Sequence, residues 1–227
     1  MVVERVAVLG GTGEEGFGLG ARWAAAGIEV VVGSRDAGRA EAAAQRLAER
    51  VPGARVDGAE NPDAAASADV VVATVPFAGQ AALYKSVAES LRENAVVVDC
   101  TVPLAAGVGG RATHVLGVWQ GSAAQHAASL LPKGTALCAA FHSLSAHALA
   151  DLDHALDGDV LVCGAKAGKP AVRALVEAIA GLRYVDAGPL EAARIVEPIT
   201  ALLVGINRRY GTDRAGIRVT GIGDPPR

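Results

Sequence analysis

A strand, a glycine turn and a helix open the chain, and this arrangement limits the fold more than any other feature of the sequence. An apolar run at 6–9 leads directly into the pattern G-x-G-x-x-G, formed by Gly11, Gly13 and Gly16, and residues 21–26 continue as a helix. The first glycine permits a tight turn, the second lets a pyrophosphate approach the backbone, and the third lets the helix pack on the strand. The pattern predicts a dinucleotide-binding βαβ unit.

The position of this pattern matters more than its glycine spacing. Glycine makes up 28 of the 227 residues, so three glycines at these offsets are weak evidence alone. Here, however, they follow the first apolar run and open a helix, and a second apolar run at 28–32 lies at the distance expected of the next parallel strand. The free N–H groups and the positive dipole end of the helix would then bind phosphate.

The end of the second strand indicates which dinucleotide is bound. An NAD site usually has Asp or Glu there, about 20 residues beyond the glycine pattern, to accept the ribose hydroxyl groups. This chain has Ser34 and Arg35, with Arg39 one helical turn later. A hydroxyl and two guanidinium groups suit a 2′-phosphate, which favours NADP. The alternative is NAD, with Asp36 as the ribose ligand if the strand ends two residues later.

Apolar runs alternate with helical segments to the end of the chain. Runs such as 70–72 and 96–98 are typical of strands buried on both faces. The alternation predicts an α/β fold of the Rossmann type, a doubly wound parallel sheet with a small C-terminal α/β lobe. We predict an NADP-binding Rossmann domain at 1–147 and the smaller lobe at 148–227. Strands are expected near 6–9, 28–32, 56, 69–75, 95–99, 135–141, 160–163, 183–186 and 217–219. Helices are expected near 21–26, 39–50, 81–93, 123–131 and 190–207, and two more are expected to start at 61–63 and at Pro170.

Composition excludes several classes of function. The net charge of −3, with both signs interspersed, gives no indication of a nucleic-acid partner. Apolar runs shorter than about 18 residues predict no membrane span, and the early first strand leaves no room for a signal peptide, so a cytoplasmic protein is expected. The three cysteines and five histidines lack metal-binding spacing, and no metal is expected.

The loops after the strands contain few groups that could transfer a proton. Ligands of open parallel sheets bind outside the carboxyl ends of the strands, which here means the loops 11–16, 75–79, 102–104 and 142–146. His142 is the single titratable residue of the last three. This suits hydride transfer between two stacked rings, where the protein supplies orientation and an apolar cleft, so we predict no catalytic side chain.

Six segments, read in order, resemble one family. These are VAVLGGTGEEGFGLG, VVGSR, TVPF, AFHSLSA, DVLVCG and DAGPLEAARIVEPITALLVGIN, and together they extend over nearly the whole chain. They are similar to the NADPH-dependent reductases of coenzyme F420, also called F420H2:NADP oxidoreductases. The resemblance implies an enzyme that transfers a hydride between NADP(H) and the deazaflavin F420. It also implies a homodimer in which the C-terminal lobe completes the deazaflavin pocket.

The resemblance also implies roles for individual residues. Thr12 would join Ser34, Arg35 and Arg39 at the 2′-phosphate, and the backbone of Gly13, Glu14 and Glu15 would line the pyrophosphate. Positions near the nicotinamide would be Val75, Gly79, Val102, Leu104 and Ala146. The pocket for the second ring would contain Pro103, His142, Ser143 and Leu144.

Two other classes of function are open from the sequence. One is an NADP-dependent reductase of a small imine or of a keto or hydroxy acid, although such enzymes usually add a long helical domain, and only about 80 residues follow His142 here. The other is a non-catalytic NADP-binding redox sensor, for which the sequence offers no partner-binding insertion.

Overall fold

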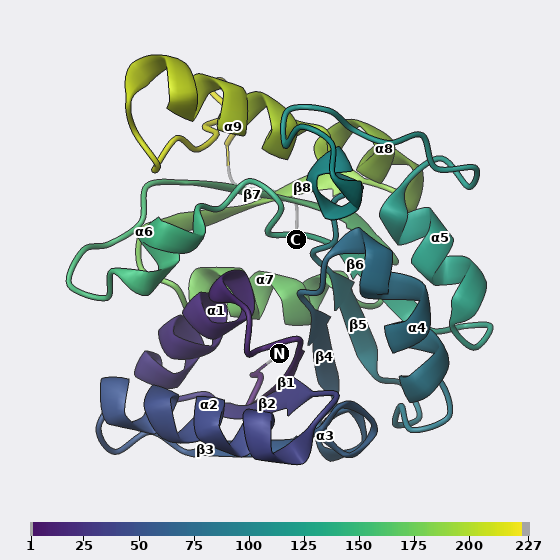
Figure 1. The fold of residues 1–227 in the computed structure, drawn as a ribbon, viewed down its shortest axis with the longest axis vertical. Helices are drawn as coiled ribbons and strands as arrows, with labels where there is room; N and C mark the ends of the chain where they lie inside the picture. Colours follow the sequence, from purple (N-terminus) through teal and green to yellow (C-terminus); the bar gives the residue numbers. More distant parts are fainter. Residues whose placement is uncertain (1, 224–227) are drawn as a thin grey trace.

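A computed structural model describes residues 2–223 of the chain. In this part, all strands belong to one eight-stranded sheet with the order β3-β2-β1-β4-β5-β6-β7-β8 (Figure 1). The first six strands are parallel. Strands β2 and β3 lie on one side of β1, and β4 lies on its other side, so the strand order reverses between β1 and β4. Open α/β sheets bind their ligands at such a reversal. The strands are β1 Arg5–Leu9, β2 Glu29–Ser34, β3 Val56–Glu60, β4 Val70–Ala73, β5 Val96–Asp99, β6 Ala136–Ala139, β7 Gly158–Gly164 and β8 Leu182–Gly188.

Helices cover both faces of this sheet, and successive strand residues alternate between the two covers. One cluster of buried residues joins α1, α2 and α7 to side chains such as Val6 and Val8, and the other joins α3, α4 and α5 to Ala7 and Leu9. This confirms the predicted α/β doubly wound fold. The helices are α1 Glu14–Ala25, α2 Ala37–Arg50, α3 Asn61–Ser67, α4 Phe77–Val87, α5 Ala123–Leu130, α6 Ala146–Ala150, α7 Lys169–Glu177, α8 Ala193–Val196 and α9 Ile199–Tyr210, with 3-10 turns η1 Ala105–Val108 and η2 Leu190–Ala192.

The direction of the last two strands differs from the parallel prediction. β7 pairs antiparallel with β6, and β8 is parallel to β7. A parallel strand would require a crossover along a sheet face, usually by a helix. The connection at 140–157 contains only the five-residue α6, and it stays at the edge where β6 ends. An apolar run indicates burial but carries no information about strand direction.

Two helical predictions also need correction. The helix expected at 190–207 is divided into η2, α8 and α9. The break between α8 and α9 falls at Pro198, which has no backbone N–H for a helical hydrogen bond. The helix expected at 81–93 occupies Phe77–Val87 instead, since Pro76 occupies its N-cap position. The short α6 was not predicted at all.

The strand expected near 217–219 is absent from the described residues, but this segment is still anchored to β7. Asp159 donates its backbone N–H to the Ile217 carbonyl at 2.7 Å, and its carboxylate accepts the Val219 N–H at 2.6 Å. Arg183 donates to the same carboxylate at 2.7 and 2.8 Å and to the Val219 carbonyl at 2.6 Å. These hydrogen bonds fix the segment after α9 without a regular ladder.

Residues 2–223 contain neither a membrane-spanning helix nor a cluster of metal-binding side chains. No helix there has the length and apolar character needed to cross a membrane. Histidine, cysteine and carboxylate side chains of residues 2–223 form no group of three that could hold a metal ion.

Candidate cofactor site

The glycine turn lies between β1 and α1, and each glycine has a different steric environment. Gly10 has a φ of +78°, a left-handed conformation that favours glycine. A Cβ added to Gly16 would lie 2.4 Å from the Thr74 hydroxyl oxygen and 2.9 Å from the Gly11 Cα. Gly16 is therefore required for α1 to pack on the strands.

Gly13 differs because it faces open space. It occupies the N-cap position of α1 with φ −80° and ψ 163°, and none of the described side chains caps the helix there. An added Cβ would meet only the Gly10 carbonyl oxygen, at 3.4 Å. The start of α1 is thus open to an anion, as the spacing of the three glycines indicates.

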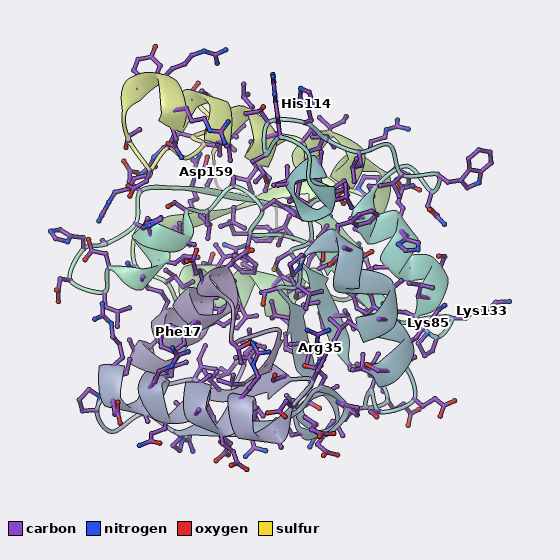
Figure 2. All side chains as sticks on the ribbon, in the orientation of Figure 1. Phe17, Arg35, Lys85, His114, Lys133 and Asp159 are labelled. Atoms are coloured by element: carbon purple, nitrogen blue, oxygen red, sulfur yellow. The ribbon has the colours of Figure 1, made fainter. Side chains whose placement is uncertain are left out.

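At the end of β2, Ser34 is the last strand residue and is buried. Arg35 and Arg39 follow it with exposed side chains; Figure 2 labels Arg35 beside the β2–α2 connection. Asp36 is the N-cap of α2, where its carboxylate accepts the Arg39 N–H at 2.8 Å. The strand therefore does not extend to Asp36, and the Asp36 carboxylate is already engaged in capping.

The loops after β4 and β5 lie next to the glycine turn. A Cβ added to Gly10 would lie 2.7 Å from Val75 Cγ1, and the Thr101 hydroxyl donates to the Val75 carbonyl at 3.5 Å. In the loop after β5, Pro103 accepts the Leu116 N–H at 2.7 Å through its carbonyl. The structure thus brings three of the four predicted loops to one edge of the sheet.

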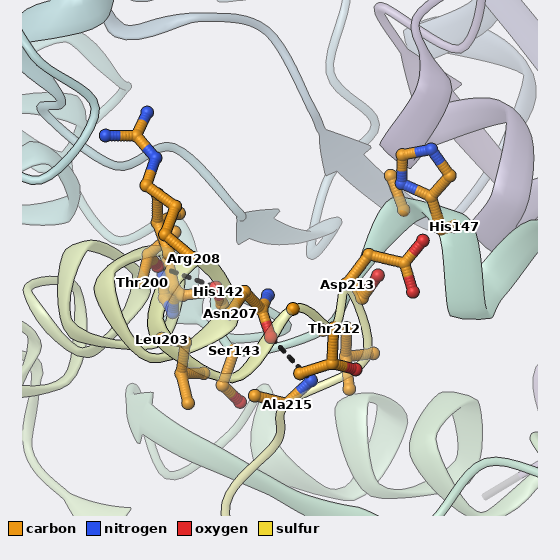
Figure 3. Close-up of a pocket in the computed structure, with 15 residues that line it drawn as sticks. His142, Ser143, His147, Thr200, Leu203, Asn207, Arg208, Thr212, Asp213 and Ala215 are labelled. Atoms are coloured by element: carbon orange, nitrogen blue, oxygen red, sulfur yellow. Dashed lines mark hydrogen bonds between the residues drawn. The ribbon is translucent and has the colours of Figure 1, made fainter.

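The fourth loop, which follows β6, forms the wall of a cavity of about 510 Å³ (Figure 3). Four predicted residues line it, namely His142, Ser143, Leu144 and Ala146. Pro103, Val75, Gly79, Val102 and Leu104 are not among its lining residues. The opposite wall comes from α9 and the segment after it, which sequence reasoning did not assign to the site: Thr200, Leu203, Val204, Asn207, Arg208, Gly211, Thr212, Asp213 and Ala215.

His142 is the most unusual residue of this cavity. Its side chain is buried, and within residues 2–223 neither ring nitrogen has a hydrogen-bond partner. Its backbone carbonyl accepts the Thr200 hydroxyl at 2.6 Å, which links the loop to α9. Burial lowers the pKa of His142 to about 4, so the ring is neutral at pH 7. The neutral ring keeps one N–H donor and one acceptor nitrogen, and the residue lines the cavity.

A buried polar network lies behind the loop after β5, and the sequence analysis missed it. Gln80 donates to the Asp99 carboxylate at 2.7 Å and to the Ala123 carbonyl at 3.0 Å, while its own carbonyl lies 3.0 Å from His126 Nδ1. Asp99 also accepts the Thr101 N–H at 3.2 Å. Burial raises the pKa of Asp99 to about 6, although these hydrogen bonds oppose the shift. The network fixes the start of the loop at 101–104.

Two further carboxyl groups lie near this network. Glu197 follows α8 and accepts the N–H groups of Ala123 and Ala124 at 2.8 and 2.9 Å, so it caps the start of α5. Burial raises its pKa to about 7. Glu15, in the first turn of α1, is partly buried. Burial and the negative charge of Asp99 raise its pKa to about 8.

The available sequence signals for these residues were weak. Asp99 ends the apolar run VVVD, a polar residue at the carboxyl end of a buried strand, and this could have been recognised. Gln80 and Thr200 lie on helices, and Glu197 lies between α8 and α9. Their contacts with distant segments are not visible in local sequence patterns.

The strand order, the open glycine turn and the loops at the carboxyl edge define an α/β dinucleotide-binding protein of the Rossmann class. A family model described as "NADP oxidoreductase coenzyme F420-dependent" matches residues 5–103. An F420-dependent NADP reductase from Methanothermobacter thermautotrophicus is 44% identical, covering 98% of this chain and 97% of that protein. The protein of the same name from Methanocaldococcus jannaschii is 38% identical, with coverages of 96% and 99%. The chain belongs to this family of F420-dependent NADP oxidoreductases.

Solved structures support the fold assignment. A structure from Arthrobacter sp. FB24, assigned by name to the F420-dependent NADP-reductases, has a TM-score of 0.80 at 23% identity and covers 96% of this chain and 99% of that one. The 3-hydroxyisobutyrate dehydrogenase of Mycobacterium tuberculosis has a TM-score of 0.64 at 19% identity, and covers 92% of this chain but 62% of the dehydrogenase. At these identities the likeness concerns the fold alone.

Proposed function

We propose that this protein transfers a hydride between NADP(H) and the deazaflavin coenzyme F420. One observation carries the proposal: a relative named F420-dependent NADP reductase is 44% identical to this chain over nearly the full length of both. An activity that requires two bound cofactors needs two neighbouring sites. The glycine turn and the cavity at His142 are candidates for those sites.

The NADP side consists of the glycine turn and the end of β2. The turn comprises Gly11, Thr12, Gly13, Glu14, Glu15 and Gly16, and the open start of α1 suits the pyrophosphate. Ser34, Arg35 and Arg39 bind the 2′-phosphate through a hydroxyl and two guanidinium groups. The capping role of Asp36 supports this assignment, because its carboxylate is engaged with α2.

The loops after β4 and β5 and the start of α6 would hold the nicotinamide, through Val75, Gly79, Val102, Leu104 and Ala146. His142, Ser143 and Leu144 would hold the deazaflavin in the cavity that they line, and Pro103 would contribute from the loop after β5. The cavity of about 510 Å³, lined by the neutral His142 and by the polar residue Ser143, suits a polar heterocycle.

When bound, the two cofactors supply the hydride donor and the hydride acceptor. The chain aligns them and excludes water, which in well-oriented systems contributes several kcal/mol, about 7 to 11 at most, to lowering the barrier. The network of Gln80 and Asp99 holds the loop at 101–104 in one conformation. Burial lowers the pKa of His142 to about 4, so the imidazolium form is absent at pH 7. The neutral ring would orient a bound ring by hydrogen bonding and would not act as a general acid.

Mixing the protein with NADPH and oxidised F420 tests the proposal. The deazaflavin and NADPH absorbances should fall together, one for one. A Gly13→Ala variant is the matched control, because it should fold but bind NADPH poorly. Oxidation of NADPH by a small imine or keto acid, with no loss of deazaflavin absorbance, would replace this proposal by the alternative reductase.

Three further parts of the proposal concern the whole protein. The division at residue 147 separates a nucleotide-binding unit from a C-terminal unit, and the cavity takes residues from both. Two copies associate through apolar side chains that are exposed on the single chain, among them Ile195 (67% exposed) and Leu202 (57%); light scattering coupled to gel filtration measures this. Three free, buried cysteines support a reducing compartment such as the cytoplasm.

A further inference from the structure

The short helix α6 lines the cavity but cannot be stable by itself. It comprises only Ala146–Ala150, and isolated helices shorter than about 12 residues are marginal in water. At its start, Ser145 accepts the Ala148 N–H at 3.3 Å. Ala146 and His147 contribute to the cavity wall. Whatever holds α6 in place therefore also sets the shape of that wall.

Arg22 of α1 holds the other end of α6. Its guanidinium group donates to the backbone carbonyls of Ala148 at 2.8 Å, Leu149 at 3.0 Å and His154 at 2.9 Å, and also to that of Asp151. The last carbonyls of a helix have no partner within the helix, and a guanidinium forms strong charge-assisted hydrogen bonds with them. Arg22 is 7% exposed, so this contact lies inside the protein.

A second arginine completes the same cap. Arg50, the last residue of α2, donates to the Ala150 carbonyl at 2.7 Å. The carbonyls of four consecutive residues, 148–151, thus accept hydrogen bonds from arginine side chains of α1 and α2. Both of these helices belong to the glycine-turn unit, whereas α6 belongs to the cavity.

Gly18 lets α1 approach α6 closely enough for these bonds. It lies one helical turn before Arg22, on the same face of α1. A Cβ added to Gly18 would lie 2.7 Å from the Cβ of Leu149, which is fully buried. Since backbone-proximal atoms in a packed interior cannot yield easily, a larger residue at this position would push α6 away from α1.

We infer that Gly18 and Arg22 are positioning residues, which fix α6 and the cavity wall at Ala146 and His147 relative to the glycine turn that begins α1. This inference rests on the proposed function for its kinetic consequence. One rigid helix then aligns two sites: its first turn faces the nucleotide, and its later turns hold the wall of the second cofactor's cavity.

Arg22→Gln is the principal test, with three readouts on the full-length protein. Hydrogen exchange of a peptide covering 142–151 should become at least about tenfold faster, because α6 loses charge-assisted hydrogen bonds. The dissociation constant of NADPH, measured by fluorescence titration, should change by less than about twofold, since the glycine turn is intact. The kcat/KM for F420 should fall roughly tenfold or more, since a displacement of about 1 Å can cost on the order of 100-fold in rate.

Gly18→Ala and Arg50→Gln keep the inference falsifiable if Arg22→Gln does not fold. Gly18→Ala should change the three readouts in the same way as Arg22→Gln, without removing a charge. Arg50→Gln should change them less, because this substitution removes one hydrogen bond at an exposed site. Arg92→Gln is the matched control: it removes a guanidinium bond to the Ala66 carbonyl of α3 and an ion pair with Asp69, both far from α6 in the chain, and should leave all three readouts unchanged.

The exchange readout separates the two proposals. If wild-type protein fails to reduce F420, the proposed function fails, but faster exchange at 142–151 in Arg22→Gln still supports the positioning role. Unchanged exchange in both Arg22→Gln and Gly18→Ala would overturn the inference. Equal losses of NADPH affinity and of kcat/KM for F420 would also overturn it, because they would indicate general destabilisation.

Discussion

Gly13 and Gly16 should respond in opposite ways to the same substitution. At Gly16, the Cβ of an alanine would lie 2.9 Å from the Gly11 Cα and 3.0 Å from the Gly10 carbonyl oxygen, so backbone atoms would have to move. Overpacking of this kind costs about 1 to 3 kcal/mol. For a protein of this size that corresponds to a fall in Tm of roughly 2 to 12 °C.

At Gly13, the same change leaves the fold nearly intact. Its backbone angles are allowed for alanine, and the new Cβ would meet only one atom, at 3.4 Å. The cost is the loss of a favourable N-cap residue, about 1 kcal/mol or less. The methyl group, however, would occupy the space through which a pyrophosphate reaches the helix N–H groups. Losing one or two charge-assisted bonds, each about 1.5 to 3 kcal/mol, should weaken NADPH binding by at least about tenfold.

Differential scanning fluorimetry and calorimetric titration with NADPH measure the two effects on the matched pair. Gly16→Ala should lower the Tm more than Gly13→Ala does, while Gly13→Ala should lose the larger part of its affinity without a comparable loss of stability. A Gly13→Ala protein that binds NADPH as tightly as wild type would refute this assignment of the turn.

Three other changes test separate parts of the site. Arg35→Ala should reduce the preference for NADP over NAD by roughly tenfold, judged from kcat/KM with each cofactor, because a charge-assisted bond to the 2′-phosphate is lost; an unchanged preference contradicts the assignment. His142→Gln should lower the single-turnover rate by less than about tenfold, since true general acids contribute about 100- to 10,000-fold; a loss of three orders of magnitude would instead indicate a proton donor. Burial, reinforced by the charge of Asp99, raises the pKa of Glu15 from 4.5 to about 8. The folded state therefore binds this proton more tightly than the unfolded chain does, and the contribution of Glu15 to the free energy of unfolding falls as the pH rises between those two values. Glu15→Gln should therefore become more stable relative to wild type as the pH rises from 6.5 to 8.5 in urea titrations. The neutral His142, with its pKa of about 4, has the opposite effect only below this pH range. A constant difference in unfolding free energy between the two proteins across the range would show that Glu15 does not titrate there.

The local parts of the fold were predictable from the sequence. Apolar runs such as 70–72 and 96–98 identified buried strands, since a strand covered on both faces requires apolar side chains at every position. The glycine turn could be assigned because its conformation depends on a few adjacent residues. The end of β2 at Ser34 also agrees with the sequence pattern.

The rest depends on contacts between distant residues. The direction of β7 follows from the short connection before it, and hydrophobicity does not encode direction. The helix α6 is too short to give a periodic pattern, and Arg22, which caps it, lies more than 120 positions earlier in the chain. Glu197 similarly caps a helix that begins 74 residues before it. Single-sequence patterns contain no signal for such pairings.

Transfer of deuterium tests the central claim most directly. NADPH carrying deuterium at both C4 positions is incubated with oxidised F420 and enzyme, and the reduced F420 is analysed by mass spectrometry. Carbon-bound deuterium does not exchange with water, so direct hydride transfer predicts one deuterium in each molecule of reduced F420. Reduced F420 without deuterium, or NADPH oxidation only when a small imine or keto acid is supplied, would contradict the account.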